Sequence, residues 1–189
     1  MAAVLLLSVW SPPSVAAPRG TSAKATRAKA SDLLGRIAKS APGTARYQLV
    51  DSVIELGDAA WPAVEPSLPG LLKLKEGEAV VVDLLLGFMI QSYDSLIGIC
   101  PSLSDHAALR ITKFVLRTTN DKARQHRLLG TMISRKSPKL LLKILPILHD
   151  AKDPAVQSRL IELVDDSNSR LQAYAIDKLA ANRYTAARP

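Results

Sequence analysis

Residues 49–72 read LVDSVIELGDAAWPAVEPSLPGLL, and this stretch decides the fold. An apolar, helix-like segment ends at Leu56-Gly57, and a second apolar segment closes on Pro66-Ser67-Leu68. The pattern recurs as LLLGFMIQSYDSLIGICPSL at 84–103 and as LLGTMISRKSPKLLLKILPIL at 128–148. Apolar residues spaced by three and four are typical of amphipathic helices, and glycine is common just after a helix. The sequence therefore predicts repeated pairs of helices.

The three copies share a Leu-Gly step, predicted to end the first helix, and a Pro-x-Leu step that closes the second. The Leu-Gly steps are Leu56-Gly57, Leu86-Gly87 and Leu129-Gly130, and the Pro-x-Leu steps are 66–68, 101–103 and 146–148. The interval between the second and third glycine is the longer one and leaves room for an extra helix at about 106–118. Ser31 is predicted to cap the first helix, and residues 153–182 are predicted to form a final pair.

The composition favours packed helices. The chain has 189 residues, of which 48% are apolar and only 4% aromatic. A core of Leu, Ile, Val and Ala suits helices better than a sandwich or barrel. Since one helix pair cannot bury its apolar stripe alone, neighbouring pairs are expected to stack. The predicted fold is all-α, a short right-handed α-solenoid of stacked antiparallel helix pairs, with an irregular bundle of the same helices as the alternative.

The Leu-Gly steps and the phrase DSNSRLQAYA at residues 166–175 resemble HEAT repeats, including the phycobilisome-lyase-like type. The resemblance covers about residues 31–182 and implies a helical-repeat domain that presents its surface to a partner. Only Arg170 stands where the family has its repeating arginine. A role as a chromophore or prosthetic-group lyase is implied by fold analogy alone.

The N-terminal residues predict a targeting segment. Residues 2–10 are almost wholly apolar, and residues 15–17 are small, as signal peptidase requires. The apolar run is too short to span a bilayer, which takes about 20 residues. Residues 1–17 are therefore predicted to be a signal segment, residues 18–30 a flexible basic linker and residues 183–189 a disordered tail. A periplasmic or secreted protein is expected, with an organellar or a cytoplasmic one as alternatives.

Basic residues are concentrated in one part of the chain. The net charge is +8, and residues 106–149 contain ten Lys or Arg and a single acidic residue. Spacings of three and four place Arg110, Lys113 and Arg117 on one helix face, and Lys136, Lys139 and Lys143 on another. The residues predicted to contact a partner are Arg110, Lys113, Arg117, Arg127, Lys139 and Lys143.

Such a positive ridge attracts acidic proteins or nucleic acid, although many charged faces are only solvated. Phe114 is the single aromatic residue in the basic segment, which is few for base stacking. An acidic protein partner is therefore the expected one. A nucleic-acid-binding protein, related in fold to DNA glycosylases, is the alternative.

Catalytic and metal-binding motifs are absent from the sequence. There is no HExxH, paired CxxC, GxSxG or Gly-rich phosphate loop, and the three histidines are far apart. Cys100 lies in an apolar run and is predicted to be a small buried hydrophobe. These observations favour a non-enzymatic scaffold or adaptor without a cofactor or metal.

Overall fold

The described part of the computed structural model, residues 22–148 and 154–181, is helical and contains no strand. The prediction of an all-α fold is therefore confirmed. The helices are α1 (Ala23–Lys39), α2 (Thr44–Ile54), α3 (Trp61–Val64), α4 (Leu68–Leu72), α5 (Gly77–Gly87), α6 (Met89–Ile99), α7 (Asp105–Thr118), α8 (Lys122–Ile133), α9 (Pro138–Ile144), α10 (Pro154–Val164) and α11 (Ser169–Ala181). None of these helices is long and apolar enough to cross a membrane.

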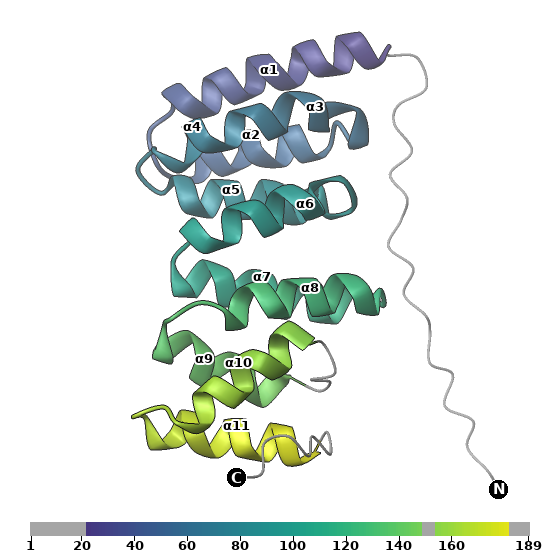
Figure 1. The fold of residues 1–189 in the computed structure, drawn as a ribbon. Helices are drawn as coiled ribbons and strands as arrows, with labels where there is room; N and C mark the ends of the chain where they lie inside the picture. The colour runs from purple at the N-terminus through teal and green to yellow at the C-terminus, as the bar shows by residue number, and fades with distance from the viewer. Residues whose placement is uncertain (1–21, 149–153, 182–189) are drawn as a thin grey trace, which may run out of the picture.

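The helices from α5 onward form two layers. In one layer α5, α7, α9 and α11 pack against each other in that order, and in the other α8 lies between α6 and α10. The pairs α5–α6, α7–α8 and α10–α11 join the layers, and at the N-terminal end α1 packs on α2 and α3, and α2 on α5. Figure 1 shows the helices following one another in chain order from α1 at one end to α11 at the other.

Helix α1 begins earlier than the sequence predicted. Ser22 is its N-cap, and the serine Oγ accepts a hydrogen bond from the N–H of Ala25 at 3.2 Å. Ser31, the predicted cap, lies inside the helix. Thr26 and Ala30 are buried, so the helix already has a core-facing side in the segment that was predicted to be a linker. The predicted targeting segment 1–17 and tail 183–189 lie outside the described residues.

The Pro-x-Leu step recurs in the structure with one local geometry. Each proline lies in a 3₁₀ turn, at Glu65–Ser67, Cys100–Ser102 and Leu145–Ile147. The prolines are exposed, whereas the leucines that follow are at most 3% exposed. Each turn therefore directs its leucine into the core, where Leu68, Leu103 and Leu148 act as anchors.

The Leu-Gly step, in contrast, marks three different positions. Gly57 follows α2 with a φ of +70°, a backbone conformation that favours glycine. Gly87 is the last residue of α5, but Gly130 lies inside α8. The prediction that the helix ends at Leu129-Gly130 is wrong because the apolar stripe continues beyond it to Met132 and Ile133, both fully buried.

The core is one continuous, mainly aliphatic cluster that runs through both layers. Trp61 and Phe88 form an aromatic pair within it, with ring centroids 5.7 Å apart. Cys100 is completely buried, as predicted, and burial raises the pKa of its thiol to about 12. The thiol is therefore neutral at physiological pH and packs as an apolar side chain.

Acidic side chains tie successive helices of the α5–α7–α9 layer together at their N-terminal ends. The carboxylate of Glu78 accepts hydrogen bonds from the N–H and Oγ of Ser104, at 2.5 and 2.6 Å. Asp105 accepts in the same way from the hydroxyl of Ser137. Because Ser104 is the N-cap of α7 and Ser137 is the N-cap of α9, these contacts hold the starts of the helices in register.

Candidate partner-binding face

Helices α7 and α9 present equivalent positions to solvent. Arg110 lies six residues after the cap Ser104, and Lys143 lies six residues after the cap Ser137. The next residues, Ile111 and Ile144, are both fully buried. Asp105 holds the starts of α7 and α9 together through Ser137. Arg110 and Lys143 therefore lie at the same angular position, or phase, around the two neighbouring helices and extend from the same side of the layer.

The other cations of these two helices share that phase. Lys113 and Arg117 follow Arg110 at intervals of three and four residues, and Lys139 precedes Lys143 by four. All five are exposed, and each step returns to nearly the same side of a helix that turns about 100° per residue. We call this set the basic face: Arg110, Lys113, Arg117, Lys139 and Lys143.

The sixth predicted contact, Arg127, lies elsewhere. It belongs to α8 in the other layer, and its guanidinium forms an ion pair with Asp94 of α6 at 2.5 Å. Arg127 therefore extends from the layer of α6, α8 and α10, and not from the layer of α7 and α9. Lys136 is exposed but precedes α9, in the turn after α8, and so does not continue the helical spacing of Lys139 and Lys143.

Four members of the basic face have no acidic partner within the described residues. Arg110 forms an ion pair with Asp83 of α5 at 2.6 Å. No ion pair joins Lys113, Arg117, Lys139 or Lys143 to a carboxylate in 22–148 or 154–181. These four side chains are exposed, so an acidic ligand can reach their charges. The Arg110–Asp83 ion pair is also exposed at its arginine, and such pairs contribute at most about 1 kcal/mol to stability.

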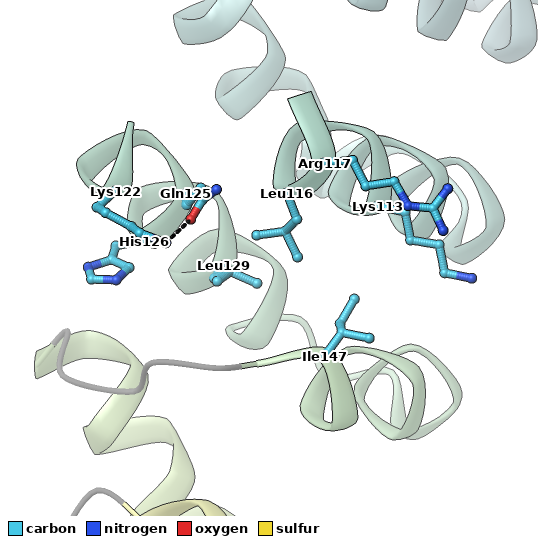
Figure 2. A pocket seen from close by; sticks show the side chains of 8 residues that line it. All are labelled: Lys113, Leu116, Arg117, Lys122, Gln125, His126, Leu129 and Ile147. Carbon is cyan, nitrogen blue, oxygen red and sulfur yellow. Dashed lines mark hydrogen bonds between the residues drawn. The ribbon is translucent and has the colours of Figure 1, made fainter. Parts of the chain in front are cut away.

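A pocket of about 300 Å³ opens beside the basic face, between α7, α8 and the turn Leu145–Ile147. We call it the α7–α8 pocket. The described residues that line it are Lys113, Leu116, Arg117, Lys122, Gln125, His126, Leu129 and Ile147. Figure 2 shows Leu116, Leu129 and Ile147 in the middle, with Lys113 and Arg117 on one side and Lys122 and His126 on the other.

A second, more open hollow of about 650 Å³ lies on the other side of Lys113 and Arg117, over α2, α5 and α7. Its charged lining is mixed, because Asp51 and Asp83 face it together with Arg110 and the two shared cations. Phe114, 36% exposed, adds an aromatic surface. Lys113 and Arg117 thus stand between two hollows of different charge.

The start of α8, which places Lys122, is held firmly. Asp121 caps the helix, accepting a hydrogen bond from the N–H of Arg124 at 3.1 Å. The hydroxyl of Tyr93 donates to the carbonyl of Arg124, whose guanidinium lies 5.2 Å from the centre of the tyrosine ring. Burial raises the pKa of Tyr93 to about 12, so the phenol remains a neutral donor. Lys122 itself donates to the side-chain oxygen of Gln125 at 3.3 Å.

The sequence pointed to Lys122 only as one of the basic residues of segment 106–149, and it did not point to Leu116 or Ile147. Leu116 and Ile147 look like ordinary core positions, and their shared pocket depends on how α7 meets the turn after α9.

Within the described residues, no three His, Cys, Asp or Glu side chains come together as a group that could hold a metal ion. Comparison of the chain with protein-family models, with curated proteins and with solved structures finds no match.

Proposed function

We propose that the protein is a non-enzymatic scaffold whose basic face binds an acidic segment of a protein partner. The observation that supports this most strongly is the arrangement of Lys113, Arg117, Lys139 and Lys143. They lie at one phase of two helices in register and have no described carboxylate to neutralise them. A rigid row of like charges attracts the opposite charge and speeds its association.

The proposal includes the architecture that holds the row. We infer a right-handed, HEAT-like solenoid, in which each helix pair repeats the position of the previous one. The recurring links Glu78–Ser104 and Asp105–Ser137 support it, as does the successive packing within each layer. Stacked repeats of this kind form extended surfaces suited to protein binding.

Nucleic acid is the less favoured ligand. Phe114 is the only Phe, Tyr or Trp side chain that lines either of the described hollows beside the basic face, whereas single-strand binding uses several stacking platforms. In addition, Asp51 and Asp83 border the face and would repel a phosphate backbone that followed α7 toward α5.

The double substitution Lys113→Glu and Arg117→Glu is expected to weaken partner contact strongly. Benzoylphenylalanine in place of Phe114 serves as a photo-cross-linker in the living source cell, because this exposed ring adjoins both cations. The probe should cross-link to an acidic protein segment, identified by mass spectrometry. Charge reversal should lower the yield by about tenfold or more, since two attractions become repulsions.

The matched control is Lys29→Glu with Arg36→Glu, two exposed cations on α1 that change the net charge equally. This control should leave the cross-link unchanged. An undiminished cross-link in K113E/R117E, or one made to nucleic acid, would reject the proposed function. Circular dichroism should show the same helix content in all three proteins because every substituted side chain is exposed.

A further inference from the structure

We propose that the α7–α8 pocket receives one apolar side chain of the partner, and that acidic residues on both sides of that side chain bind the cations at the rim. This inference rests on the proposed function and specifies the motif that the partner would carry: a short acidic segment interrupted by a single leucine-like residue.

The shape and floor of the pocket support an apolar anchor. A volume of about 300 Å³ is at the lower end of ligand pockets, which suits one side chain better than a large cofactor. Leu116, Leu129 and Ile147 lie in its middle, as Figure 2 shows, and come from α7, α8 and the turn after α9. Anchor residues that fill such pockets contribute most of the binding energy in many interfaces.

The charges at the rim support acidic neighbours on both sides of the anchor. Lys113 and Arg117 lie on the α7 side, and Lys122 lies on the α8 side. No carboxylate occurs among the described residues that line the pocket. A peptide with a carboxylate before and after its apolar residue would therefore meet a cation at each side, whereas a peptide with basic flanks would be repelled.

Lys122 has a defined place on the α8 side of the pocket. It is the first residue of α8, directly after the N-cap Asp121, and its ammonium donates to the side-chain oxygen of Gln125, which also lines the pocket. This hydrogen bond holds the ammonium at the rim, where a carboxylate of the partner can reach it.

The open hollow over α2, α5 and α7 fits this ligand less well. Asp51 and Asp83 contribute negative charge to it, and a purely acidic segment would be repelled there. The partner segment is therefore expected to bind at the α7–α8 pocket rather than at the larger hollow.

Fluorescence anisotropy with the purified full chain tests the proposal. The probe is a short labelled peptide in which one leucine is flanked on each side by two glutamates. Replacing its leucine with alanine should weaken binding by about tenfold, because the buried apolar surface is lost. Lys122→Glu should weaken binding of the leucine peptide by about tenfold at low salt.

Lys122→Glu should at the same time unfold at the same temperature as the natural chain or a higher one, so that lost binding cannot be attributed to lost structure. The matched control is Lys136→Glu, an exposed lysine in the neighbouring turn that does not line the pocket, and it should bind like the natural chain.

The outcomes separate the two proposals. If K113E/R117E loses the peptide while K122E and the alanine peptide bind normally, the pocket assignment is wrong and the basic face stands. If the natural chain binds neither peptide more tightly than a lysine-flanked one, the pocket assignment is also rejected. The cross-linking result at Phe114 then decides the proposed function separately.

Discussion

Replacing Gly77 with alanine is expected to lower the free energy of unfolding by about 3 kcal/mol. A Cβ at this position would lie 1.9 Å from the carbonyl oxygen of Leu71 and 3.0 Å from its carbonyl carbon. These are backbone atoms of α4, so relief requires a shift of the helix rather than of a flexible side chain. Gly77 is buried at the start of α5, the first helix of the layer that continues to α7 and α9. Urea denaturation monitored by circular dichroism measures the loss.

Gly35→Ala is the matched control. Gly35 lies inside α1, and nothing would lie within 4 Å of its Cβ. Alanine is the better helix former by about 1 kcal/mol, so this variant should be as stable as the natural chain or more so. Equal effects of the two substitutions would contradict the close approach of α4 to α5.

Arg135→Ala is expected to lower the free energy of unfolding by a similar amount, about 3 kcal/mol. The guanidinium donates to the carbonyl oxygens of Cys100 and Leu103, at 2.9 and 2.7 Å, and forms an ion pair with Asp105 at 3.1 Å. The side chain is only 15% exposed. Alanine would leave both carbonyls and the carboxylate without these partners, at the point where the end of α8 meets the start of α7.

Two comparisons test whether the loss comes from this geometry. Arg135→Lys retains the charge but not the planar fork, so it should recover only part of the stability. Arg110→Ala removes an ion pair whose arginine is 48% exposed, and it should cost at most about 1 kcal/mol. If Arg135→Ala cost no more than Arg110→Ala in the same urea titrations, the buried linkage would be ruled out.

Local sequence patterns were sufficient to predict helices and their exposed faces. The spacing of Arg110, Lys113 and Arg117 predicted one helix face. The structure confirms it because all three are exposed, whereas Ala108, Ile111 and Val115 on the same helix are completely buried. These predictions depend only on helix periodicity, which the chain expresses within a few turns. The Pro-x-Leu anchors were recognisable because the step recurs three times in the sequence.

Features that depend on packing between distant segments were not predictable. Arg127 looked equivalent to Lys113, but α8 lies in the other layer, where Asp94 neutralises the arginine. The repeated arginine was expected at Arg170, which is exposed, whereas the buried linkage between layers is made by Arg135 after α8. The α7–α8 pocket likewise depends on Ile147, which the turn after α9 brings against α7 and α8.

The central claim is that the cations of α7 and α9, together with Lys122, form one binding surface for an acidic ligand. Nuclear magnetic resonance of the ¹⁵N-labelled chain during titration with the leucine–glutamate peptide tests it most directly. The largest amide shift changes are expected at 110–118, 122–129 and 139–147, and they should vanish in K113E/R117E. Shift changes centred on α1 to α4 instead, or the same changes in the charge-reversed chain, would contradict the claim.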